Sequence, residues 1–485
     1  MIDLQIVNWP VTLSLGVIQI GIFLFLRSSK NMAFPVAVMA FVIVASVAVL
    51  VKLLFPKVDA AAVQLSISAL VVISAFLCGR PLRRNAVLLA SGAGVVTAAL
   101  FVVSQLITRL GGYSSIGFGD GQTVISISEG FQAGVYDRPD GIIGLKRGFG
   151  LPAYQSLGFE GEFLVGFLPV VFLAALVATY VLLSNLISNR ALLNVSYASL
   201  LVILLSTESV TRHVYLMNTH SLTWTIFAVL LVGLLKFVKS EQDKSTWVMV
   251  CVALATASML RADNLLILAP TLMLLTWLAR SEPKLHRVGF WVATFVPFAS
   301  WATISGFGLP GLGLFGFPLF AILGFLVGLG VIWLMDKPWA SDKLMQWLAK
   351  GILLGTIFLA FALAPGAWTS IMNIFINLFL GEGLWGATPL ALLLLYVALL
   401  IFDRGASSQQ QKWVFAVVSG TIGALILAKF GDGLSKSGNL GGFARIGWGD
   451  SLNRMFVYFI PGIATLLLLR IESVWGRLEA KSGRR

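Results

Sequence analysis

The chain carries continuous apolar runs that are long enough to cross a lipid bilayer as helices. A crossing takes roughly 20 residues of helix, and these runs are unbroken rather than alternating, which favours helices over a membrane β-barrel. Hydrophobic residues make up 58% of the chain, charged residues 11%, and the mean hydropathy is +0.92. A soluble domain usually holds about 25% charged residues. The sequence therefore predicts a polytopic integral membrane protein.

We place about fifteen membrane spans along the chain, with roughly 13 to 15 as the range. The expected spans are residues 8–26, 33–55, 61–78, 86–106, 161–184, 191–206, 217–237, 246–260, 263–279, 288–305, 312–335, 346–365, 386–402, 412–429 and 454–471. The expected fold class is all-α, a polytopic transmembrane helical bundle whose long external loops bear short amphipathic helices. We expect an N-terminal transmembrane extension (1–85), a transmembrane core (86–472) that includes the external loop 107–160, and a basic cytoplasmic tail (473–485).

The distribution of charge predicts the orientation. The side that follows the odd-numbered spans holds 22 of the 34 Lys and Arg residues but 8 of the 21 Asp and Glu residues. Basic loops are enriched on the cytoplasmic side of membrane proteins, so we expect a cytoplasmic C-terminus. We therefore attribute the net charge of +13 to basic residues that anchor loops beside membrane lipids. We expect no nucleic-acid partner.

The longer connections fall on the opposite, external side, and the first of them carries an amphipathic pattern. Long ordered loops often carry function. Val124, Ile127 and Phe131 recur at helical spacing, with Glu129 between them, and Asp120 precedes them. This spacing predicts a short interfacial helix with Asp120 at its N-terminal end, where a carboxylate interacts favourably with the helix dipole. Asp120 is either a simple helix cap or a functional carboxylate.

The remainder of this loop, residues 136–152, is rich in Gly and Pro, which predicts turns rather than a helix. It contains Arg138, Lys146 and Arg147 on the side where basic residues are scarcer. These cations either anchor the loop at lipid headgroups or contact the phosphate of a lipid substrate.

Three further polar groups lie at predicted external ends of spans. Glu208 and Arg212 are four residues apart and can form an ion pair, and His213 follows them. His220 is interpreted as structural. Arg261 and Asp263 lie between two apolar runs with almost no loop. Burying ionisable groups near membrane depth costs free energy, so such groups tend to be paired or functional. The two residues are therefore either an ion pair that anchors the hairpin or a functional pair.

The last external connection ends with Arg445 and Arg454. Arg454 opens the final span from the external side. It is either a snorkelling anchor or a ligand for an anionic headgroup.

Taken in order, these segments resemble the GT-C glycosyltransferases, especially the bacterial protein mannosyltransferase-like and arabinofuranosyltransferase-like enzymes. The resemblance covers roughly residues 86–470. Its motifs are Asp120 followed by the amphipathic stretch to Gly134, the basic segment Lys146–Pro152, the turn Arg261-Ala-Asp263 followed by Pro270, and Arg454 at the start of a late span. The chain departs from the family in having Gly121 where many members have a second acid, and in having three spans before the first matching one.

The resemblance implies transfer of a sugar from a polyprenyl-phosphate donor to a cell-envelope acceptor (a glycan, a lipid or a protein) at the external, periplasmic face of a bacterial inner membrane, with inversion. Asp120 would be the general base, with Glu129 and Glu208 as further catalytic candidates. The substrate and its phosphate would be bound by a set drawn from Arg138, Lys146, Arg147, Arg212, His213, Arg261, Asp263, Arg445 and Arg454. No cofactor is fixed by the sequence. A divalent cation, Mg²⁺ or Mn²⁺, stays open, because one carboxylate makes a poor divalent site.

Two other functions fit the same composition. A lipid-linked oligosaccharide polymerase or ligase also has external arginines and a large loop but needs no catalytic carboxylate. A transporter or flippase of lipid-linked sugars would be expected to show matched repeats and broken helices. The Gly-rich stretch 306–330 is the best candidate for a broken helix, although small residues also allow close helix packing.

Overall fold

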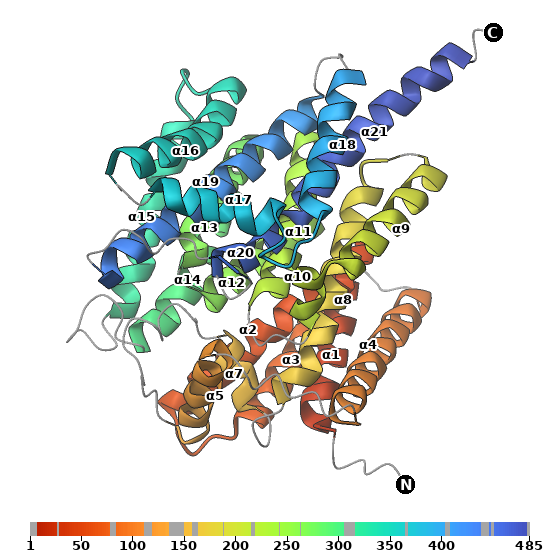
Figure 1. Ribbon diagram of the computed structural model, residues 1–485. Coiled ribbons are helices and arrows are strands. Elements are labelled where there is room, and N and C mark those ends of the chain that lie inside the picture. Colours follow the sequence, from red (N-terminus) through yellow and green to blue (C-terminus); the bar gives the residue numbers. More distant parts are fainter. Residues whose placement is uncertain are drawn as a thin grey trace. The chain divides into compact units, whose positions relative to one another are not determined.

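The computed structural model describes residues 7–26, 29–77, 84–110, 119–134, 150–157, 163–187, 189–214, 219–241, 243–261, 263–304, 316–363, 367–402, 408–437, 446–447 and 451–482. Over these residues the chain is helical and contains no strand, which confirms the all-α prediction (Figure 1). The chain divides into two compact units, and each unit is described by itself.

Unit 1 comprises Met1–Ala178, His213–Leu265 and Ala279–Met335. Its helices are α1 (Trp9–Phe25), η2 (Lys30–Met32), α2 (Ala33–Leu54), α3 (Ala60–Leu77), α4 (Arg84–Leu110), α5 (Gly119–Gln132), α7 (Gly150–Ser156), most of α8 (Phe163–Ser184), most of η3 (Arg212–Val214), α11 (His220–Val238), α12 (Lys244–Leu260), η4 (Ala279–Ser281), α14 (Lys284–Ile304) and α15 (Gly316–Met335).

Unit 2 comprises Thr179–Arg212, Leu266–Leu278 and Asp336–Arg485. Its helices are α9 (Arg190–Ser206), α10 (Glu208–Thr211), most of α13 (Asp263–Leu278), α16 (Asp342–Leu363), α17 (Ala367–Phe379), α18 (Thr388–Phe402), α19 (Gln409–Ser437), α20 (Ser451–Met455), η7 (Phe456–Phe459) and α21 (Ile460–Ser482).

Each of the fifteen expected spans coincides with a helix of the structure. Within the described ranges, eight helices are long and apolar enough to cross a membrane, or nine if the bent pair Arg190–Ser206 and Glu208–Val214 forms one span. Further apolar stretches are shorter: Trp9–Phe25, Lys244–Leu260, Thr388–Ile401 and the part Ala321–Met335 of α15. The apolar helices support a membrane protein, while a count of fifteen spans and the orientation stay predictions.

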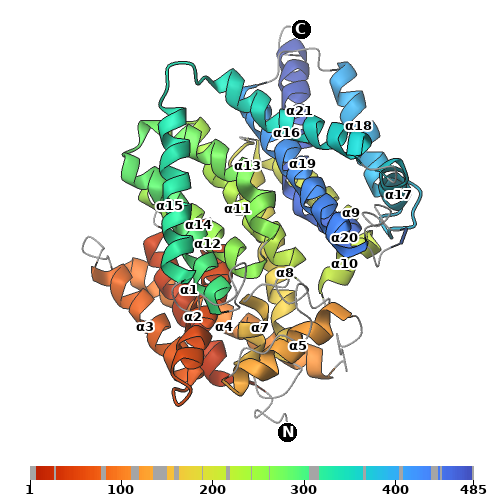
Figure 2. The same ribbon diagram turned by 90° about the vertical axis from the view of Figure 1, so that its left-hand side faces the viewer.

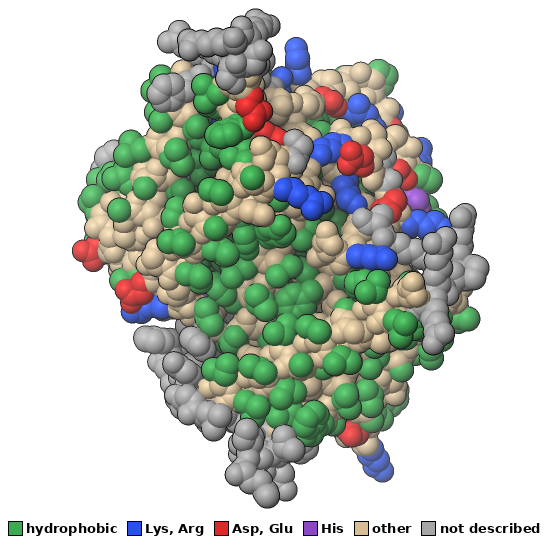
Figure 3. Space-filling model, turned by 90° about the vertical axis from the view of Figure 1, so that its right-hand side faces the viewer, with side chains coloured by type: hydrophobic (Ala, Val, Ile, Leu, Met, Phe, Trp, Pro, Cys, Tyr) green, Lys and Arg blue, Asp and Glu red, His purple; other side chains and the backbone are tan. Residues whose placement is uncertain are grey.

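Burial separates the helices of unit 1 into inner and outer ones. The apolar windows of α2 and α11 are 78% and 89% buried, whereas those of α3 and α4 are 22% buried. A helix that is apolar on all sides but exposed requires an apolar solvent. Broad areas of hydrophobic side chains are visible on the face in Figure 3. The exposed apolar sides of α3 and α4 are therefore suited to lipid contact.

Small residues set the closest helix contacts within each unit. In unit 1, Gly16 of α1 and Gly94 of α4 approach backbone to backbone. In unit 2, Gly420 and Gly423 bring α19 against the backbone of α16, and these two helices lie side by side (Figure 2). Packing through small residues is the usual means of helix association in membranes, where lipid removes the hydrophobic driving force.

Candidate functional site

The amphipathic helix predicted in the first long loop is present as α5. It begins at Gly119, so Asp120 lies in its first turn. Val124, Ile127 and Phe131 are buried, while Glu129 is exposed on the other side of the helix. The predicted pattern is therefore confirmed. The buried row packs α5 onto α7 and, more lightly, onto α2.

The segment predicted to consist of turns ends in a helix instead. Gly150, Leu151 and Pro152 form the first turn of α7. The prediction treated Gly and Pro only as helix breakers, but Pro is tolerated in a first turn, where the backbone N–H groups have no partner within the helix. The side chain of Gln132 in α5 donates a hydrogen bond to the carbonyl of Ser156, at 3.3 Å, and so ties the two helices together.

An aromatic cluster fixes α7 inside unit 1. The ring of Tyr154 stacks on Phe167 with centroids 4.3 Å apart and meets the edge of Phe41 at 5.4 Å. Burial raises the pKa of the Tyr154 hydroxyl well above its ordinary value, because the charged form would lose its hydration. Tyr154 therefore acts as a neutral packing residue.

Helix α7 begins at the C-terminal end of α12. A Cβ atom at Gly150 would lie 2.9 Å from Cγ1 of Val42 and 3.2 Å from Cδ2 of Leu260. Only a residue without a side chain fits this approach. The loop that carries Asp120 is thus connected by direct packing to the turn that follows Leu260.

That turn holds a buried ion pair. Arg261 donates two parallel hydrogen bonds to Asp263, Nε to Oδ1 and Nη2 to Oδ2, both 2.7 Å long. The two side chains are 6% and 16% exposed. Asn264 is buried and donates to the carbonyl of Ala257 at 3.0 Å. The bidentate geometry holds the guanidinium group in one orientation at the start of α13.

Two buried histidines lie close together in unit 1. The rings of His213 and His220 meet edge to face with centroids 5.3 Å apart, and Ser221 donates to the carbonyl of His213. Gly233 of α11 packs directly against Val250 of the antiparallel α12. Ten steps from this contact reach Thr223 near the start of α11 and Leu260 at the end of α12, so the histidines and the ion pair lie near the same end of this helix pair. Sequence spacing gave no signal for this arrangement.

Unit 2 has a different polar arrangement at its predicted outer end. Glu208 and Arg212 form the expected ion pair, with side chains 54% and 43% exposed. Helix α10 is attached to the segment before α18, because the Ser209 amide donates to the carbonyl of Leu384 at 2.9 Å. The hydroxyls of Thr207 and Thr388 are also 2.9 Å apart.

A network of neutral side chains holds the start of the last span. The indole of Trp385 donates to Oδ1 of Asn453 at 2.8 Å, and Asn453 donates to the carbonyl of Gly383 at 3.1 Å. The neighbouring Arg454 is buried within unit 2, 6% exposed, and so does not extend along an exposed surface. Arg454 stands out in the sequence by its charge, whereas Asn453 and Trp385 do not, because uncharged residues in an apolar run give little signal.

The structure divides the predicted residues between the two units. The helix bearing Asp120 and Glu129 and the group His213, Arg261 and Asp263 belong to unit 1, while Glu208, Arg212 and Arg454 belong to unit 2. Convergence of the two groups on one cavity stays a prediction. The side chain of Asp120 and the residues Arg138, Lys146, Arg147 and Arg445 lie outside the described parts.

Among the described residues no three His, Cys, Asp or Glu side chains are grouped as a metal site would require.

Comparison with protein-family models, with curated proteins and with solved structures finds no match to this chain.

Proposed function

We propose that this chain is a membrane glycosyltransferase of the GT-C type, which moves a sugar from a polyprenyl-phosphate donor to a cell-envelope acceptor at the external face of a bacterial inner membrane. The observation that carries the proposal is the connection in unit 1 from α5, with Asp120 in its first turn, through α7 to the buried Arg261–Asp263 pair. This connection supports the proposal, because a candidate base and an oriented cation would then be held by helices that pack on one another.

In this mechanism Asp120 takes the proton from the acceptor hydroxyl as that oxygen attacks the anomeric carbon. The bond from this carbon to the donor phosphate breaks as the new glycosidic bond forms, so a single displacement inverts the configuration. The leaving polyprenyl phosphate gains negative charge, which Arg261 is suited to stabilise because Asp263 orients its guanidinium group.

The remaining candidates have supporting roles in this proposal. Arg454 and Arg212 are further cations for the leaving phosphate, and Glu129 and Glu208 are further carboxylates. Glu208 is engaged by Arg212, which makes it the weaker candidate for a base. A divalent cation, Mg²⁺ or Mn²⁺, would add charge stabilisation for the phosphate if the enzyme uses one.

The test is release of polyprenyl phosphate by the purified chain, offered polyprenyl-phosphate sugars and a membrane acceptor fraction. We expect Asp120→Asn to reduce the rate by about 10²-fold or more, the usual contribution of a general base. Asp59→Asn is the matched control, because Asp59 also lies at a helix start, where it accepts a hydrogen bond from the Ala61 amide, and Asn can replace it there. Equal release by wild type and Asp120→Asn would exclude Asp120 as the base and favour a polymerase or ligase.

A further inference from the structure

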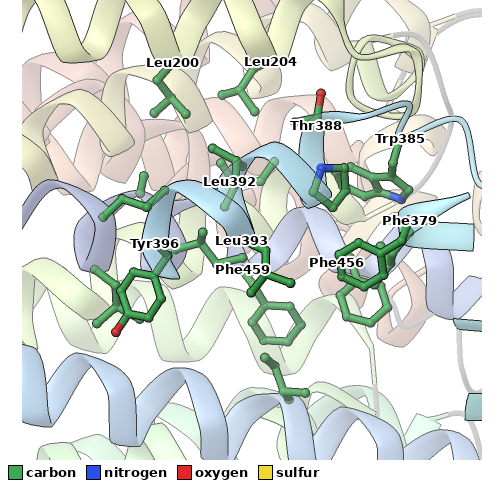
Figure 4. Close-up of a pocket in the computed structure, with 18 residues that line it drawn as sticks. Leu200, Leu204, Phe379, Trp385, Thr388, Leu392, Leu393, Tyr396, Phe456 and Phe459 are labelled. Atoms are coloured by element: carbon green, nitrogen blue, oxygen red, sulfur yellow. The ribbon is translucent and has the colours of Figure 1, made fainter. Parts of the chain in front are cut away.

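Unit 2 contains an apolar groove that the proposed sugar transfer does not use. It has a volume of about 310 Å³ and is formed by side chains of α9, α17, α18, α19, η7 and α21. Figure 4 shows Tyr396 at one end of this groove, Trp385 and Phe379 at the other, and Leu392, Leu393 and Phe459 between them. Nearly all lining atoms are apolar, so the groove suits a hydrocarbon chain.

The groove is about as long as one leaflet of a membrane is thick. Lining residues run from Phe456 to Leu467 along the last span, which is roughly 16 Å at the rise of a helix. Half of the hydrocarbon core of a bilayer is about 15 Å. The groove therefore has about the length of one acyl chain. It runs from Leu467, in the predicted cytoplasmic part of this span, toward Phe456, near its predicted external end.

A basic pocket of about 200 Å³ adjoins one end of the groove. Tyr396 and Leu466 line both spaces, so the two spaces are direct neighbours. The pocket is also lined by Lys350, Lys412 and Arg470, and none of its described lining residues is acidic. All three cations lie toward the helix ends that are predicted to face the cytoplasm.

Two features keep positive charge in this pocket. The Nζ atom of Lys350 lies 5.6 Å from the ring centroid of Phe415, so a cation–π contact directs it toward α19. Helix α19 also begins here: the backbone amide of Gln411 donates to the hydroxyl of Ser408, and the Gln411 side chain accepts from the Ser408 amide. The N-terminal end of a helix attracts anions through its dipole and its N–H groups.

From this juxtaposition we propose that the groove and the basic pocket together bind an anionic phospholipid of the cytoplasmic leaflet. Its phosphate group lies among Lys350, Lys412 and Arg470, and one acyl chain lies in the apolar groove. Basic pockets between transmembrane helices on the cytoplasmic side recognise anionic headgroups in this way. The proposal is independent of the sugar-transfer proposal, because no residue of the basic pocket belongs to it.

The test is native mass spectrometry of the full-length protein in detergent, titrated with phosphatidylglycerol or with phosphatidylcholine of the same acyl chains. We expect one phosphatidylglycerol to remain bound in preference to phosphatidylcholine. The double variant Lys350→Gln/Lys412→Gln removes two cations without cutting into the buried core, and we expect it to weaken phosphatidylglycerol binding by roughly tenfold or more. Binding of phosphatidylcholine should not change.

Lys343→Gln is the matched control, because Lys343 is exposed on the same helix α16 but does not line the pocket. Ala464→Phe fills the groove, and we expect it to weaken both lipids while the melting temperature reports whether the fold is intact. Equal binding of the two lipids by wild type, or unchanged phosphatidylglycerol binding by the double variant, would overturn the proposal. Tighter binding of polyprenyl phosphate through the same lysines would overturn the assignment to a phospholipid.

Discussion

The two units stabilise their predicted outer ends in opposite ways. In unit 1 the ion pair Arg261–Asp263 is buried, and the surrounding elements are packed through aromatic and glycine contacts. In unit 2 the ion pair Glu208–Arg212 is about half exposed, and the buried positions are filled by the neutral network of Trp385 and Asn453. Two pairs of an arginine and a carboxylate therefore differ in their contribution to stability, because burial and not charge alone decides the cost of breaking an ion pair.

The largest effect is expected from Asp263→Ala. It leaves the buried guanidinium group of Arg261 without its bidentate partner, and loss of one member of a buried pair costs about 3–5 kcal/mol. We expect a large drop in the melting temperature in detergent. The double variant Arg261→Leu/Asp263→Leu removes both charges and should recover much of the loss, which would separate the cost of an unpaired charge from that of lost packing.

A small effect of Asp263→Ala on melting would contradict this account of unit 1. In that case the ion pair would be solvated in the folded protein, and the packing of α7 against Leu260 would carry the stability of this end instead. The single-variant melting temperature, compared with that of the double variant, decides between the two.

An intermediate effect is expected from Trp385→Phe in unit 2. The substitution keeps an aromatic ring but removes the N–H donor to Asn453, and a buried acceptor left unsatisfied costs about 1–3 kcal/mol. Trp475→Phe is the matched control, because Trp475 donates to Glu479 on an exposed helix face and its hydrogen bond can be replaced by water. Equal melting temperatures for the two variants would show that the neutral network does not stabilise unit 2.

The sequence predicted the helices well because apolar runs of this length leave few alternatives. It also predicted α5, since Val124, Ile127 and Phe131 form one helical face that is buried as expected. The start of α7 was predicted wrongly, because Gly and Pro at a first turn resemble a loop in sequence. The count of crossings is harder to predict, because an apolar helix of fewer than about 18 residues is either a short span or a buried half-span.

The site was only partly predictable for a related reason. Charged residues in apolar surroundings stand out, so Arg261, Asp263 and Arg454 were identified. Contacts between segments far apart in sequence, such as Gly150 with Leu260 or Trp385 with Asn453, depend on how helices pack and leave no local pattern. The basic pocket was missed because its three cations come from three helices and each one alone resembles an ordinary cytoplasmic anchor.

The smallest effect is expected from Glu208→Gln, and it is the sharpest test of the comparison between the two ion pairs. Glu208 and Arg212 are four residues apart on an exposed surface, where such a pair contributes about 0.3–0.5 kcal/mol and is screened by salt. The melting temperature should change little in low salt and not at all in high salt. If sugar transfer fell sharply while melting stayed unchanged, Glu208 would have a role in substrate binding or catalysis that its exposure to solvent permits. A melting loss as large as that of Asp263→Ala would instead mean that this pair is covered in the folded protein, and the contrast between the two units would disappear.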